Sequence, residues 1–187
     1  MHTIKTTLRN KSAWPIDVVW ENAQDLEHVA TLHGRTNYSF QLLDVRRSSD
    51  PRLPYESLVY TATRRMFGFL PVSAFGFRRI VPDREREIWQ MDVSPLLRVS
   101  TALRSTLERD PDDPERTILV DYVTITVPSI FRPFEKMLVE MLRRHTRLQC
   151  EEDESFRERR VELKKRGIHL RPSILATPAW ERDFGRD

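Results

Sequence analysis

The residues best suited to chemistry lie in one short segment near the start of the chain. From Glu21 to His33 the sequence has the form E-x3-D-x2-H-x4-H, with its aspartate at Asp25 and its first histidine at His28. Neutral imidazole rings this close together are candidate ligands for a divalent metal, and neighbouring carboxylates can orient them. The spacing therefore predicts that His28 and His33 bind one metal ion.

This spacing also demands an irregular backbone. On an ideal helix, two side chains five positions apart point about 140° away from each other. A helix that ends near Gly34, or loosens just before it, would bring both rings to one pocket. Apolar residues at helical spacing predict a first helix from about Trp14, and Asp25 is suited to cap a second, short helix that carries the motif.

Together with the Trp-Glu-Asn sequence at positions 20–22, the motif resembles the mononuclear-iron site of Rieske non-haem oxygenase catalytic domains, which belong to the helix-grip (START/SRPBCC) superfamily. The resemblance implies that His28 and His33 are iron ligands and that the third ligand is Asp153, on the C-terminal helix. It also implies a catalytic role for Asp25, which would link the iron to the iron–sulfur cluster of a neighbouring subunit in a homo-oligomer. The implied cofactor is mononuclear Fe(II).

The residues alone leave two candidates for the third ligand. On a helical wheel Glu152 lies near the centre of the apolar stripe, whereas Asp153 lies about 100° further round, at its edge. Periodicity favours Glu152 and the resemblance favours Asp153, which we adopt as the prediction. Two histidines and one carboxylate would leave open positions that suit non-haem Fe(II). His145 is on the same stripe, but about 12 Å from Asp153 along the helix, so it is interpreted as a core histidine.

Composition limits the function classes. The 187 residues are 39% hydrophobic and 32% charged with a net charge of +3, which is typical of a soluble globular protein and gives no basic face for nucleic acid. No apolar segment has the length of a membrane span or a signal peptide, so we expect a cytoplasmic protein. Cys150 is the only cysteine, so this chain cannot build an iron–sulfur cluster, and an oxygenase would draw electrons from a separate redox partner protein.

Hydrophobic periodicity predicts an α+β helix-grip fold. Residues 3–9 are expected to form a first strand, and period-two alternation predicts six more strands joined by turns, at 38–42, 58–62, 72–74, 89–93, 97–103 and 118–124. One apolar stripe predicts a long helix from near Phe131 to about residue 165. An antiparallel sheet of six or seven strands would then wrap this helix, in a single domain over residues 1–187 with an irregular tail at 170–187. The charge run from Arg157 to Arg166 is interpreted as the solvated end of the helix.

Two functional hypotheses follow from a mostly apolar cavity between sheet and helix. The first is an iron-dependent, oxygenase-like domain that acts on a hydrophobic or aromatic small molecule. The alternative is a metal-free helix-grip carrier or cyclase-like protein that binds a hydrophobic small molecule. The iron hypothesis explains the spacing of His28 and His33 but needs an electron source that this chain lacks. The carrier hypothesis needs no electron source but leaves that spacing unexplained.

Overall fold

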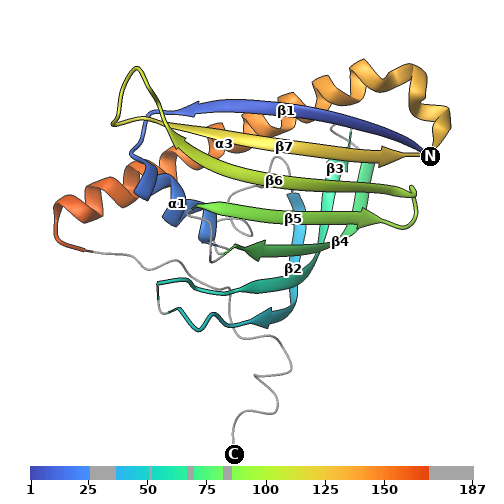
Figure 1. Ribbon diagram of the computed structural model, residues 1–187. Helices are drawn as coiled ribbons and strands as arrows, with labels where there is room; N and C mark the ends of the chain where they lie inside the picture. The colour runs from blue at the N-terminus through green and yellow to red at the C-terminus, as the bar shows by residue number, and fades with distance from the viewer. Residues whose placement is uncertain (26–36, 51, 67–69, 82–85, 169–187) are drawn as a thin grey trace, which may run out of the picture.

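The computed structural model describes residues 1–25, 37–50, 52–66, 70–81 and 86–168. In this part of the chain seven strands form one antiparallel sheet in the order β1-β7-β6-β5-β4-β3-β2 (Figure 1). The strands are β1 (His2–Ser12), β2 (Asn37–Arg46), β3 (Ser57–Met66), β4 (Leu70–Ile80), β5 (Glu87–Ser94), β6 (Val99–Arg109) and β7 (Thr117–Val127). Since β1 pairs with β7 and the other strands follow one another as hairpins, the predicted meander is confirmed.

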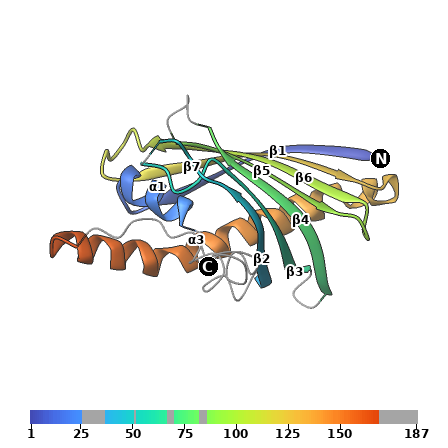
Figure 2. The same cartoon turned by 90° about the horizontal axis from the view of Figure 1, so that it is seen from below.

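In the described part of the chain, two α-helices cover one face of this sheet. Helix α1 (Ile16–Gln24) follows β1, and helix α3 (Glu135–Lys165) ends the described chain. Figure 2 shows the sheet curving over α3, which runs along its concave side. A 3-10 turn, η2 (Ser129–Phe134), precedes α3, because Pro133 lacks the N–H that a regular helix would need there. The predicted long helix is confirmed from Glu135 to Lys165, whereas its predicted first residues, 131–134, belong to the 3-10 turn. The architecture is a helix-grip fold.

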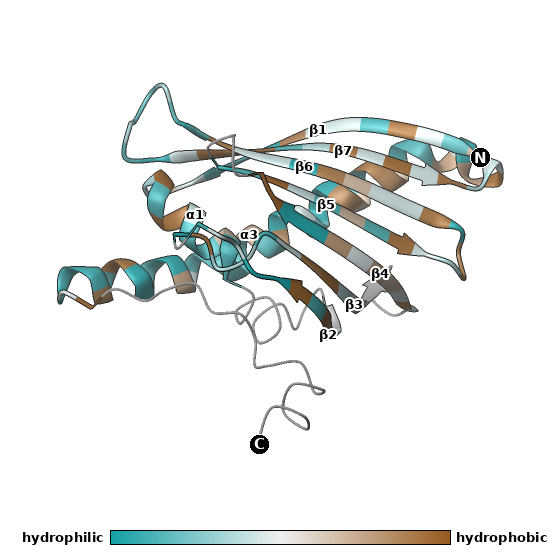
Figure 3. Cartoon of the chain, turned by 60° about the horizontal axis from the view of Figure 1, so that its bottom comes forward, coloured by the Kyte–Doolittle hydropathy of each residue, from teal (hydrophilic) through white to brown (hydrophobic). Residues whose placement is uncertain are grey.

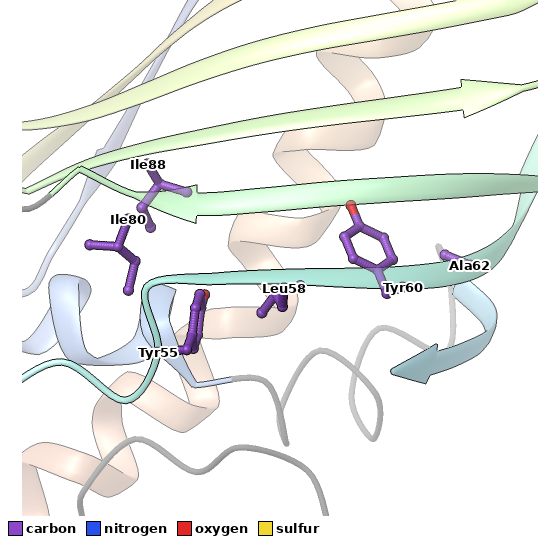
Figure 4. Packing of buried hydrophobic residues seen from close by; sticks show 6 residues of the cluster. All are labelled: Tyr55, Leu58, Tyr60, Ala62, Ile80 and Ile88. Atoms are coloured by element: carbon purple, nitrogen blue, oxygen red, sulfur yellow. The ribbon is translucent and has the colours of Figure 1, made fainter. Parts of the chain in front are cut away.

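The core is divided between the two ends of the sheet. One buried cluster joins β3, β4 and β5 to α1, and Figure 4 shows its members Tyr55, Leu58, Tyr60, Ala62, Ile80 and Ile88. The other cluster joins β1 and β7 to α3 through Ile4, Leu8, Val123, Ile125, Val127 and Leu138. The two clusters hold α1 and α3 against opposite parts of the same concave face and leave space between them.

The C-terminal half of α3 is not the fully solvated segment that the charge run predicted. Figure 3 shows hydrophilic colour along this half, yet Arg157 and Arg160 are only 4% and 3% exposed. Each is buried together with a carboxylate: Arg157 with Asp153 on its own helix, and Arg160 with Asp25 just after α1. The prediction was wrong at these two positions, because buried charges are tolerated when they are paired.

Candidate functional site

A cavity of about 210 Å³ lies between the sheet and α3. Its apolar wall comes from both ends of the core, with Phe40 and Leu58 on one side and Leu103, Val123 and Leu142 on the other. The predicted position of the cavity is therefore confirmed. Its wall carries more charge than the sequence pattern indicated, because two arginines, three aspartates and a histidine also line it.

The first polar group on the sheet wall is a tyrosine that reaches across a strand. Tyr60 on β3 donates a hydrogen bond of 2.6 Å from its hydroxyl to Asp92 Oδ1 on β5, and Gln90 Nε2 donates to Asp92 Oδ2 at 2.8 Å. The intervening strand allows this because it has Gly76 opposite Tyr60. Figure 4 shows the Tyr60 ring extending over β4, and the ring of Phe40 stacks on it with centroids 4.9 Å apart.

The second polar group is a carboxyl at the far side of the sheet wall. Asp121 on β7 is 5% exposed, and the hydroxyl of Ser105 on β6 donates a hydrogen bond of 2.6 Å to it. Burial raises the pKa of Asp121 above its ordinary value, although the hydrogen bond from Ser105 and the charge of Arg78 act in the opposite direction. Asp121 therefore holds its proton more firmly than a carboxyl at the surface.

Arg78 is the cation of the sheet wall. It lies on β4, opposite Gln90 on β5, two residues from Gly76 on the same face of the sheet. Among the described residues its side chain makes one hydrogen bond, from Nη2 to the carbonyl oxygen of Ala23, and its buried Nε has no hydrogen-bond partner. No salt bridge to a described carboxylate neutralises this guanidinium.

The helix wall contributes His145, Cys150, Asp153 and Arg157. Asp153 Oδ2 accepts a hydrogen bond of 3.0 Å from Arg157 Nη2, and Arg157 Nη1 also binds Glu154 at 2.9 Å. Burial raises the pKa of the Cys150 thiol to about 12. A thiol with that pKa is almost entirely protonated at neutral pH, so Cys150 has little thiolate available for reaction.

Only half of the predicted iron site falls within the described structure. His28 and His33 lie outside the described residues, whereas Asp25 and Asp153 lie inside them. Asp153 lines the cavity; its competitor Glu152 is absent from the cavity wall. Asp153 therefore faces the cavity, and its role as a metal ligand stays a prediction.

Both described carboxylates of that predicted site are bound to arginines. Asp25 is 7% exposed and forms a salt bridge with Arg160, and Asp153 forms one with Arg157. A guanidinium in this position is a fixed positive charge that would compete with a metal ion for the carboxylate. Across residues 1–25, 37–50, 52–66, 70–81 and 86–168, no three His, Cys, Asp or Glu side chains gather closely enough to hold a metal. Iron binding at His28 and His33 stays a prediction.

Sequence reasoning missed the charged groups of the sheet wall, namely Arg78, Asp92 and Asp121. A signal is present for Arg78 and Asp121, because each stands on the inward face of a strand whose neighbouring inward positions are apolar or small, whereas Asp92 has the polar residues Gln90 and Ser94 as its inward neighbours. A charged residue at an inward position of an alternating strand is unusual, and its burial needs a partner or a function.

Comparisons with known proteins support the fold. No family model matches the sequence, and no curated protein matches it. Among solved structures the chain is similar to the Zhui aromatase/cyclase from Streptomyces sp. R1128, with 17% identity and a TM-score of 0.66 over 86% of this chain and 96% of the other. It is also similar to norcoclaurine synthase from Thalictrum flavum, with 11% identity and a TM-score of 0.54 over 77% and 84% of the two chains.

A third similar structure is the di-domain aromatase/cyclase StfQ from the steffimycin biosynthetic pathway. It shares 12% identity and a TM-score of 0.63 over 86% of this chain, which spans about half of the StfQ chain, at 52%. At such identities the likeness shows the helix-grip fold alone, and these structures give no support to the narrower resemblance to Rieske oxygenases. No described helix is long and apolar enough to cross a membrane.

Proposed function

We propose that the chain binds a hydrophobic, ring-containing small molecule in the cavity between the sheet and α3, as a carrier or a cyclase-like protein. The observation that carries this proposal is the cavity itself, which Phe40, Leu58, Leu103 and Leu142 line from both ends of the core. A mostly apolar hollow with a few convergent polar groups is the usual form of a small-molecule site.

The size of the cavity limits the ligand. An apolar protein cavity of about 150 Å³ accepts benzene. A cavity of about 210 Å³ is therefore suited to one ring or two fused rings, and a larger polycyclic molecule would have to extend through its mouth or widen it.

The structural likenesses agree with this proposal at the level of function class. The aromatase/cyclases are named for reactions that form rings and make them aromatic, and they share the helix-grip fold whose sheet and long helix enclose the cavity in this chain. The proposal requires no metal, so it stands whether or not His28 and His33 bind iron.

Binding of 2-naphthol, measured by isothermal titration calorimetry, tests the proposal. Leu142→Trp places a large side chain on the cavity wall and should weaken binding by about tenfold or more, since it removes the space for the ligand. Arg144→Trp is the matched control, because Arg144 is exposed on the same helix. This variant should bind 2-naphthol like the wild type. Equal affinity in both variants would show that the naphthol binds elsewhere and would refute the proposal.

The carrier and the cyclase-like versions differ in what happens to the ligand. A carrier releases its ligand unchanged, whereas a cyclase-like protein converts a linear or partly cyclised precursor. Recovery of a ligand co-purified with the protein, followed by mass spectrometry before and after incubation, separates the two versions.

A further inference from the structure

The sheet wall of the cavity has two polar ends of opposite hydrogen-bonding character. At one end Tyr60 donates its only hydroxyl proton to Asp92, and Gln90 donates a second hydrogen bond to the same carboxyl. Toward a ligand, the phenolic oxygen of Tyr60 can therefore act only as an acceptor, and both oxygens of Asp92 are already acting as acceptors. This end favours a ligand group that donates a hydrogen bond.

The other end can only donate. The guanidinium of Arg78 carries five N–H donors, no acceptor and a permanent positive charge. Within the described chain it makes one hydrogen bond, to the carbonyl oxygen of Ala23, and its buried Nε has no partner. Asp121 interacts electrostatically with Arg78, but burial raises the pKa of Asp121, which weakens that carboxyl as a counter-charge. A half-buried cation that has no salt bridge to a described carboxylate gains from an added anionic partner, so this end favours a ligand oxygen that accepts a hydrogen bond or is anionic.

The fold places the two ends side by side along β4. The Tyr60 ring crosses β4 at Gly76, and Arg78 is the next residue of β4 that faces the cavity. The backbone positions of successive residues on one face of a strand are about 7 Å apart. A ligand of one or two fused rings, which is the size that the cavity volume indicates, can therefore lie along the sheet wall with one polar group near each end.

We infer that the cavity selects an aromatic ligand with a hydroxyl group at one end, which donates to the phenolic oxygen of Tyr60, and a carboxylate or carbonyl oxygen at the other, held by Arg78. This inference rests on the proposed function and narrows it from hydrophobic small molecules to hydroxyaryl acids and ketones of one or two rings.

Three naphthalene derivatives with the same ring system test the inference on the wild-type protein. 6-Hydroxy-2-naphthoic acid carries both groups, 2-naphthoic acid lacks the hydroxyl, and 2-naphthol lacks the carboxylate. We expect 6-hydroxy-2-naphthoic acid to bind about tenfold or more tightly than either of the others in calorimetry, because each of the others loses one polar contact with the cavity wall.

Two variants assign each preference to its residue. The Tyr60→Phe variant should bind 6-hydroxy-2-naphthoic acid and 2-naphthoic acid with affinities that differ by less than about twofold. The Arg78→Met variant should bind 6-hydroxy-2-naphthoic acid and 2-naphthol with affinities that differ by less than about twofold. Tyr122→Phe and Arg79→Met are matched controls, since both side chains are exposed on the outer face of the sheet. The controls should keep the full preference of the wild type.

The outcomes separate this inference from the proposed function. If the wild type binds all three compounds equally, the two-ended selection is wrong while the cavity remains a binding site. If it binds none of them, both the selection and the proposed function are wrong. If the hydroxyl preference persists in a folded Tyr60→Phe protein, the assignment to Tyr60 is overturned. The wild-type series alone decides the inference if a variant fails to fold.

Discussion

Gly76→Ala is the most direct test of how the cavity wall is built. A Cβ atom at this position would lie closer than 3.0 Å to three atoms of the Tyr60 ring, Cζ, Cε1 and Cε2. The ring cannot swing aside freely, because Phe40 stacks on it and its hydroxyl is bound to Asp92. The added methyl group must therefore displace the ring and break the hydrogen bond.

The expected loss can be worked from these contacts. A buried hydrogen bond to a charged group that is left unmade costs about 1.5–3 kcal/mol, and one extra methyl in a packed core costs about 1–3 kcal/mol. Alanine in a strand is otherwise about 0.5–1 kcal/mol better than glycine, because glycine loses more backbone entropy on folding. We expect Gly76→Ala to lower the free energy of unfolding by about 2–4 kcal/mol, against the ordinary direction of a glycine-to-alanine change in a strand.

Urea denaturation followed by circular dichroism measures this change. The double variant Tyr60→Leu/Gly76→Ala supplies the internal control: once the ring is gone the methyl has room, so Gly76→Ala should cost less than about 1 kcal/mol in that background. An unfolding midpoint of Gly76→Ala at or above that of the wild type would refute the packing of Tyr60 on Gly76.

Four further predictions concern buried charges, the thiol and the metal. Asp25→Asn should destabilise the fold by about 3 kcal/mol in urea denaturation, because it leaves the guanidinium of Arg160 buried without its counter-charge. The raised pKa of Asp121 means that the folded state binds this proton more tightly than the unfolded chain, so its contribution to stability falls as pH rises above the ordinary value of 3.8. Asp121→Asn should therefore lose less stability than the wild type between pH 4 and pH 7. Cys150 should react with Ellman's reagent at pH 8 on the order of a thousandfold more slowly in the folded protein than after denaturation, because its pKa is about 12. If the iron prediction is correct, protein purified without a histidine tag should contain iron, and a chelator should lower the melting temperature of the wild type but not of His28→Ala.

Each of these four has its own check. Glu162→Gln and Asp112→Asn change exposed carboxylates and should leave stability and its pH profile nearly unchanged. His145→Ala should retain any iron that the wild type binds, since the prediction gives His145 no role as a ligand. Rapid labelling of Cys150 in the native state would show that the thiol is not protected. Metal-free protein that gains no stability from added Fe(II) would contradict the iron site and leave the carrier or cyclase-like proposal unaffected.

Local pattern was sufficient for the elements of this fold. Alternation with a period of two located the strands, since a half-buried strand must place apolar side chains on every second residue. One apolar stripe located α3, and the order of the elements along the chain was enough to predict a sheet wrapped around that helix. These features depend on neighbours within a few residues, which the sequence displays directly.

The cysteine count also excludes two kinds of chemistry from this chain. With Cys150 as its only cysteine, it can form neither an internal disulfide nor its own iron–sulfur cluster. The sequence pattern did not determine which residues line the cavity. The polar wall depends on which residues of separate strands lie opposite one another, and a shift of register by one residue would turn every side chain to the other face.

Tertiary structure alone decided the pairings that make the site. Tyr60 reaches Asp92 only because Gly76 lies opposite it on the strand between them. Asp25, at the end of α1, is paired with Arg160, which is 135 positions away in the sequence. Periodicity favoured Glu152 as the inward carboxylate, yet the docking of α3 turns Asp153 toward the cavity. Such contacts join residues whose separation along the chain carries no local signal, so they follow from strand register and helix docking rather than from pattern.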